Sequence, residues 1–148
     1  MPGDRTKNHR SHIVPLPDQA LAILDAVPFR VGRRHIFGIG EGGFSGWSKA
    51  KQELDARIAS ARRQARLNDD MGPWVLHDIR RSAVTHWHEL GFAPPHVVEA
   101  IVNHVSGHKA GVAGIYNKAL YLPERREALE KWAAFLGQEI DRGAGAHA

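Results

Sequence analysis

Four residues whose side chains can act on a phosphate lie between positions 77 and 116 of this 148-residue chain. His77 and Arg80 are three positions apart, so on a helix they lie one turn from each other on one face. His104 follows a second apolar helical pattern, and Tyr116 follows a linker interrupted by glycines. A guanidinium binds phosphate oxygens in a planar fork, an imidazole transfers protons near neutral pH, and a phenol can attack phosphorus. These residue types in this order predict chemistry on a phosphate group.

The order of these residues resembles the tyrosine recombinases, also called phage-type integrases. Members of that family carry His-x-x-Arg, then an Asn-His or Gly-His pair at the end of a helix, then a tyrosine. Residues 5–16, Arg-Thr-Lys-Asn-His-Arg-Ser-His-Ile-Val-Pro-Leu, are similar to the family's β-hairpin that carries a catalytic lysine. Each element alone is short and unspecific, but their order and spacing agree with the family over residues 3–136.

The resemblance implies a role for each matched residue. Tyr116 would be the nucleophile that forms a 3′-phosphotyrosyl intermediate, and Lys7 the acid that protonates the leaving 5′ oxygen. Arg80, His77 and His104 would stabilise the charge on the scissile phosphate, without a metal ion or any other cofactor. The implied activity is site-specific cleavage and rejoining of double-stranded DNA, by a tetramer assembled on DNA in the full-length protein. Further DNA contacts are expected from Arg10, Lys49, Arg81 and Lys118.

Two of the matched positions have rivals nearby. Tyr121 competes with Tyr116, but family members with a Tyr-Asn-basic segment followed by a second Tyr-Leu use the first tyrosine. His108 stands 8 residues before Tyr116 and His104 stands 12 before it, whereas the usual family spacing lies between these values. His104 is preferred because Val-Asn-His at 102–104 fits the helix-end pattern better.

Two other motifs suggest different chemistry. The pairs His104-x3-His108 and His86-x-His88 could bind zinc, but the chain has no cysteine and no carboxylate of an HExxH motif. The segment Gly-Ile-Gly-Glu-Gly-Gly at 38–43 lacks both a Walker lysine and the strand–GxGxxG–helix context of a phosphate loop. Neither a metal site nor a nucleotide site is therefore expected.

Length and charge fit a single domain with an anionic partner. A chain of this length buries a sizeable core, and a net charge of +4 with a pI near 9.8 raises the expectation of nucleic acid. There is no apolar run long enough for a membrane span, and no apolar core of a signal peptide follows the basic N-terminus. With no cysteine to form a disulfide, a cytoplasmic location is the expectation.

The expected fold is α+β but mainly α, a helical bundle like a tyrosine recombinase catalytic domain with a small β-hairpin or sheet near the N-terminus. Apolar periodicity predicts helices at about 17–27, 45–65, 77–90, 94–103 and 123–136, and Arg34 to Phe37 as a brief strand. The domain is expected to span 1–136, with a flexible tail at 137–148, where glycine and alanine are frequent.

One catalytic element of the family is missing. No Gly-x-Arg helix with its further catalytic arginine precedes Lys7, and no separate DNA-clamping domain precedes it either. This favours a partial catalytic domain, cut from or decayed from a longer integrase. Three functions stay open: a catalytic recombinase domain, a non-catalytic DNA-binding or assembly module, and an unrelated helical protein that binds metal through histidine.

Overall fold

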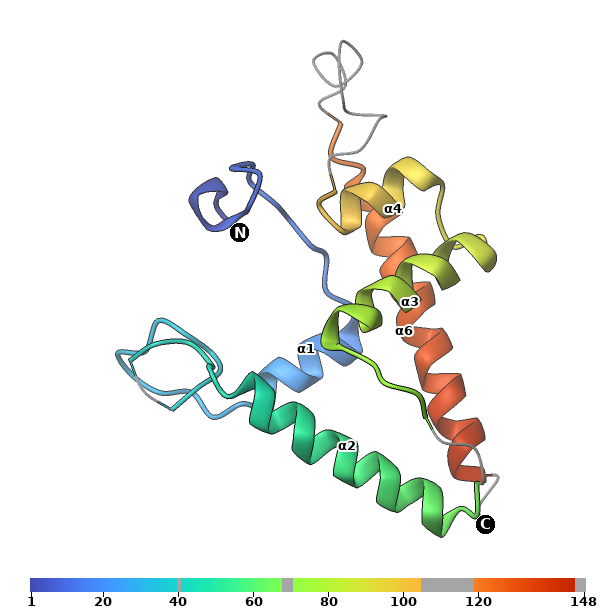
Figure 1. Ribbon diagram of the computed structural model, residues 1–148. Coiled ribbons are helices and arrows are strands. Elements are labelled where there is room, and N and C mark those ends of the chain that lie inside the picture. The colour runs from blue at the N-terminus through green and yellow to red at the C-terminus, as the bar shows by residue number, and fades with distance from the viewer. Residues whose placement is uncertain (40, 68–70, 105–118, 146–148) are drawn as a thin grey trace.

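The computed structural model describes residues 1–39, 41–67, 71–104 and 119–145 (Figure 1). The described residues form one 3-10 turn and five α-helices, which confirms the mainly helical class. In chain order these are η1 (Gly3–Arg5), α1 (Asp18–Asp25), α2 (Trp47–Gln64), α3 (Leu76–Glu89), α4 (Pro95–Ile101) and α6 (Leu122–Gly145).

The prediction of an N-terminal β-hairpin is wrong, because none of the described residues lies in a strand. Gly3–Arg5 forms η1, and Lys7 and Asn8 lie in a turn that follows it. The hydroxyl of Thr6 donates to the carbonyls of Gly3 and Arg10, at 3.0 and 2.7 Å. A side chain thus satisfies carbonyls that a hairpin would pair with a neighbouring strand. The segment folds into a compact turn around Lys7 instead.

The core lies where α3, α4 and α6 meet, which are the only helix pairs of the described chain with extensive contact. Its centre consists of Val97 and Val98 from α4, Trp87 from α3 and Ala128 from α6. The apolar stripe of α4 is buried at Val97, Val98 and Ile101. That of α3, predicted from its spacing, is buried at Ala83 and Trp87 but not at Ile79 and Leu90, which are 59% and 44% exposed. Pro95 stands at the first position of α4, where its missing N–H and fixed φ cost the helix nothing.

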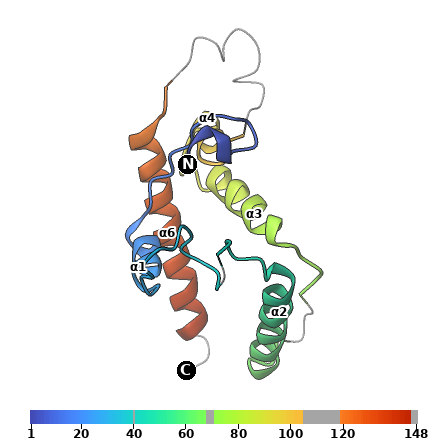
Figure 2. The same cartoon turned by 90° about the vertical axis from the view of Figure 1, so that its left-hand side faces the viewer.

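Helices α1 and α2 lie outside this core. Both carry apolar residues at helical spacing, yet neither has a buried residue. Figures 1 and 2 show α2 as a long helix set apart from α6, joined to α3 by an extended segment. Lys51 links α2 to that segment, since its ammonium lies 3.9 Å from the centre of the Trp74 ring.

Several boundaries differ from those expected. Helix α2 begins at Trp47 with Gly46 as its cap, two residues after the start expected at Ser45. Residues 34–37 form bends and no strand. Helix α6 extends to Gly145, beyond the end that the apolar periodicity predicted near residue 136. Within the described residues, no helix is both long and apolar enough to cross a bilayer.

Candidate functional site at the end of helix α4

The C-terminal end of α4 is closed by a Schellman cap whose two outer residues are the predicted Asn-His pair. Asn103 has a φ of 53°, a left-handed conformation that asparagine tolerates better than most residues. Its N–H donates to the carbonyl of Ala100 at 3.4 Å, and the N–H of His104 donates to that of Glu99 at 3.0 Å. This pattern satisfies carbonyls that a helix end leaves open. The motif in the sequence is thus a backbone device that fixes the direction of His104.

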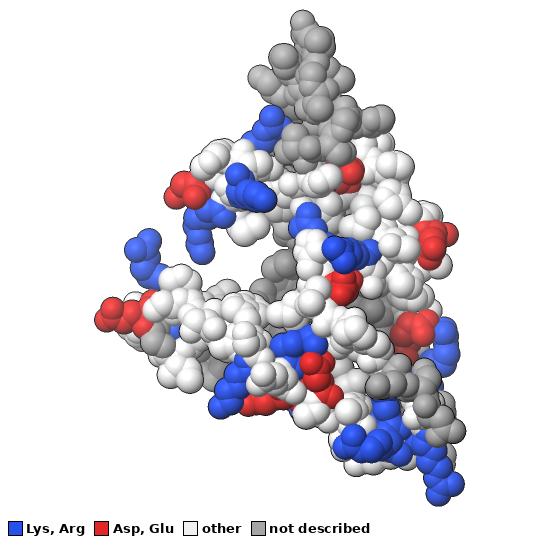
Figure 3. Space-filling view, in the orientation of Figure 1, with Lys and Arg blue, Asp and Glu red and all other residues white. Residues whose placement is uncertain are grey.

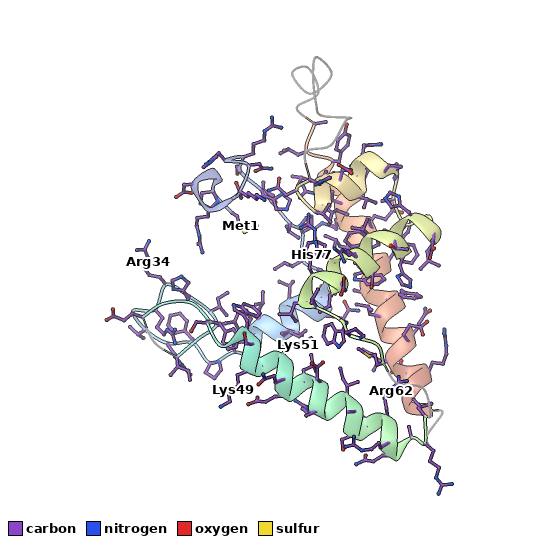
Figure 4. All side chains as sticks on the ribbon, in the orientation of Figure 1. Met1, Arg34, Lys49, Lys51, Arg62 and His77 are labelled. Carbon is purple, nitrogen blue, oxygen red and sulfur yellow. The ribbon has the colours of Figure 1, made fainter. Side chains whose placement is uncertain are left out.

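Arg80 reaches this cap from α3. Its Nη2 donates to the carbonyl of Val102, the last residue before Asn103, while the residue itself is exposed. His77 lies one turn earlier, in the first turn of α3, and is also exposed (Figure 4). The structure therefore brings the guanidinium of Arg80 to the main chain just before His104. The imidazole of His77 lies on α3, the helix that carries Arg80.

Asp78 holds the start of α3 in place. Its Oδ2 accepts the N–H of Val75 at 2.8 Å, and its Oδ1 lies 2.9 Å from Nη1 of Arg81. These contacts, the backbone N–H first and the guanidinium after it, hold the pKa of the Asp78 carboxyl below its usual range. An acidic residue in the first turn also suits the helix dipole. The capping carboxylate thus fixes the turn from which His77 and Arg80 project.

The N-terminal turn docks on the same cap. Nδ2 of Asn8 donates to Oδ1 of Asn103 at 2.9 Å, across 95 residues of sequence. Lys7 is the neighbour of Asn8 in that turn and is exposed. The predicted general acid thus lies next to a residue that contacts the helix cap, although the turn replaces the expected hairpin.

Behind the cap lie two buried polar residues, His12 and Arg125, which no sequence motif singled out. Nε2 of His12 contacts the carbonyl of Ile101 at 3.1 Å. Arg125 of α6 is 3% exposed, and it donates to the carbonyls of Leu120 and Ile13. Burial, followed by the nearby Arg125 guanidinium, lowers the pKa of His12, and burial lowers the pKa of Arg125. They link the N-terminal segment, the end of α4 and the start of α6.

Comparison with known proteins agrees with this arrangement of motifs. The chain is 37% identical over 135 residues to prophage integrase IntA of Escherichia coli K12, covering 90% of the chain and 30% of IntA. It is 26% identical over 137 residues to prophage integrase IntS of the same strain, covering 91% of the chain and 32% of IntS. The integrase of Shigella phage Sf6 is 26% identical over 136 residues, with 90% and 32% covered.

This chain is related to the phage integrases. It spans 30–32% of the length of these relatives. No protein-family model and no solved structure matches it.

The remaining predicted site residues of this chain lie away from the cap of α4 or outside the described residues. Lys49 is exposed on α2, Arg10 is exposed beyond the N-terminal turn, and Arg81 is paired with Asp78. Tyr121, the rival nucleophile, is half-buried with its ring 4.8 Å from that of His96, packed beside the core. Some of the earlier assignments fall outside the described residues: Tyr116, Lys118 and the rival His108.

The surface of the protein is hollowed beside the candidate site. Figure 3 shows a recess between the N-terminal turn and the loop before α2, with Lys and Arg side chains on both rims. Arg34 points across it from the loop, opposite Met1 (Figure 4). Beside it is a pocket of about 640 Å³, lined by Arg5, Arg34, His35 and aromatic residues of the loop. Among the described residues, no three His, Asp or Glu side chains lie close enough together to hold a metal ion.

Proposed function

We propose that this chain carries the strand-exchange chemistry of a tyrosine-type site-specific recombinase, acting in phage or mobile-element integration and excision. The observation that carries the proposal is convergence at the end of α4. Arg80 donates to Val102, the cap orients His104, and the turn holding Lys7 docks on Asn103 through Asn8. Segments separated by almost a hundred positions in the sequence thus meet at one place.

In the proposed reaction, Tyr116 gives its phenolic proton to solvent, and its phenolate oxygen attacks the phosphorus of a DNA phosphodiester. The bond from phosphorus to the 5′ oxygen breaks, and Lys7 gives that oxygen a proton, leaving a free 5′ hydroxyl and a 3′-phosphotyrosyl ester. Arg80, His77 and His104 stabilise the charge on the non-bridging oxygens. A 5′ hydroxyl of another strand then gives its proton to Lys7 and attacks the ester, which releases the tyrosine. The exchange therefore needs no ATP.

Double-stranded DNA is the proposed partner, with the recess of Figure 3 as its place of contact. A net charge of +4 and the basic side chains on both rims favour a polyanion. Arg10, Lys49, Arg81 and Lys118 are proposed to bind backbone phosphates, which would give affinity without sequence preference. We propose a tetramer for the longer protein, because exchange between two duplexes needs a nucleophile on each of four strands.

The test is formation of a covalent adduct on a nicked DNA substrate. Because relatives are longer, the assay uses a chimera in which this chain replaces the matched segment of IntA. Tyr116→Phe is expected to abolish the adduct while DNA affinity stays unchanged, and Tyr121→Phe is the matched control. An adduct that survives Tyr116→Phe and disappears with Tyr121→Phe would contradict the assignment. The adduct is also expected to form in excess EDTA.

A non-catalytic DNA-binding module is the other outcome of this assay. The 148-residue chain alone is expected to bind duplex DNA weakly, with an affinity that falls steeply as salt rises. Fluorescence anisotropy at two salt concentrations measures this directly. Salt-sensitive binding without any adduct in the chimera would favour the module, and no binding at low salt would mean that the basic faces of this chain are only solvated surface.

A further inference from the structure

Glu99 contacts His104 twice from the last turn of α4. Its carbonyl accepts the N–H of His104 at 3.0 Å, as part of the Schellman cap. Its carboxylate faces the ring, with Oε2 and Oε1 at 3.3 and 3.5 Å from Nδ1. The first contact fixes the main chain at position 104, and the second fixes the ring. No motif in the sequence singles out Glu99 for this role.

We propose that Glu99 is a positioning residue that determines which ring nitrogen His104 presents to a DNA phosphate. An ionised carboxylate only accepts hydrogen bonds, so Nδ1 must carry the hydrogen that lies between the two groups. Nε2, on the far side of the ring, is then the atom left for a substrate. The side chain of His104 is 61% exposed, whereas that of Glu99 is 31% exposed. The arrangement holds one nitrogen against the protein and leaves the other accessible.

The helix that carries Glu99 is suited to this task because it is firmly anchored. Val97, Val98 and Ile101 are buried on the opposite side of the same helix. Arg80 contributes a further contact, from α3 to the carbonyl of Val102. A partner that orients a functional histidine through its second nitrogen acts only if it is itself held in place.

This inference rests on the proposed function, which supplies the phosphate that Nε2 would meet. When Nε2 takes a proton from solvent, the ring becomes an imidazolium that donates a hydrogen bond to a non-bridging oxygen. The carboxylate of Glu99 then lies beside the positive ring, on the side away from the phosphate. Glu99 does not touch the DNA in this scheme, and its effect passes through His104.

The first test measures the tautomer of His104 directly in the 148-residue chain, by nitrogen NMR of the histidine rings. His104→Gln identifies the signal by its disappearance. The neutral ring is expected to carry its hydrogen on Nδ1 in the wild type and in Glu99→Gln, which keeps an acceptor. In Glu99→Leu the Nε2–H form should predominate. Glu89→Gln, on an exposed residue of α3, is the control and should change nothing.

The second test measures adduct formation in the IntA chimera. Glu99→Leu should slow it about tenfold, Glu99→Gln should restore most of the rate, and the Kd for DNA should not change. A wild-type ring protonated on Nε2, or an unchanged tautomer in Glu99→Leu, would overturn the inference. So would a normal rate in Glu99→Leu. If even the wild-type chimera forms no adduct, the proposed function fails, while the NMR result still decides whether Glu99 orients the ring.

Discussion

Two regions of the molecule differ in how much of their apolar side chains is exposed. One is the cluster of α3, α4 and α6; the other is the arm, which runs from α1 through the loop 26–46 to α2. In the cluster, Val97 is 0% and Trp87 is 5% exposed. In the arm, Trp47 is 59% exposed, and Phe29 and Ile39 exceed 90%. Both regions have the same amphipathic pattern in sequence. A helical apolar stripe thus predicts the helix, while burial depends on whether another element of the chain covers that stripe.

The difference also separates the roles of the two regions. Arg80 and His104 belong to the cluster, where packed helices can hold them in a fixed geometry. The arm carries Lys49 and Arg34, whose long side chains can contact a polyanion without being fixed. We therefore expect the chemistry to depend on the packing of the cluster, and the affinity for DNA to depend more on the charge of the arm.

A matched pair of tryptophan substitutions tests the comparison with the largest expected effect. Trp87→Ala removes a buried ring from the cluster and should lower the free energy of unfolding by about 3–5 kcal/mol. Trp47→Ala removes an exposed ring and should change it by no more than about 0.5 kcal/mol. Urea unfolding followed by circular dichroism measures both. Similar losses in the two variants would show that the arm is packed as tightly as the cluster.

Arg125 provides a test of how the cluster holds the N-terminal segment. Arg125→Met keeps the length of the side chain but removes the guanidinium, so the carbonyls of Leu120 and Ile13 lose their donor. The expected loss in the free energy of unfolding is about 1–3 kcal/mol. Arg126→Met is the control, since Arg126 is the exposed neighbour on the same helix. Equal midpoints of thermal unfolding for the two variants would remove Arg125 as an anchor.

Lys51 gives the smallest expected effect and concerns the arm itself. Its ammonium contacts Asp55 at 2.6 Å and the Trp74 ring, and it joins α2 to the segment before α3. Lys51→Gln should lower the free energy of unfolding by roughly 0.5–1 kcal/mol. Lys49→Gln, two positions away and highly exposed, should have less effect. Larger destabilisation by the Lys49 change than by the Lys51 change would mean that this link does not hold α2.

Sequence patterns identified the helices and the helix-end motif well, because these depend on local chemistry. Pro95, the apolar stripe of α4 and Asn103 each specify a nearby feature of the main chain. They were less informative where distant residues compete with local preference. The family resemblance suggested a hairpin over residues 5–16, but the hydroxyl of Thr6 closes a turn by donating to two carbonyls of its own segment.

The supporting residues of the site could not be found in the same way. Glu99 and Arg125 look like ordinary charged positions of amphipathic helices in the sequence. Their functions depend on which residues the fold brings next to them, His104 in one case and Ile13 in the other. The roles of Lys7, His77, Arg80, His104 and Tyr116 remain predictions from the family motifs, as do the domain limits of 1–136 and 137–148.

The buried Arg125 has a consequence for a chain that has no cysteine. Its contact with Ile13 joins positions 112 residues apart, so the arm and the first two helices of the cluster lie inside one closed loop. A disulfide would close such a loop in the unfolded chain as well, whereas this hydrogen bond closes it only while the fold persists. In the folded chain, the two ends of the segment that contains the arm are therefore held together at one place, behind the cap of α4.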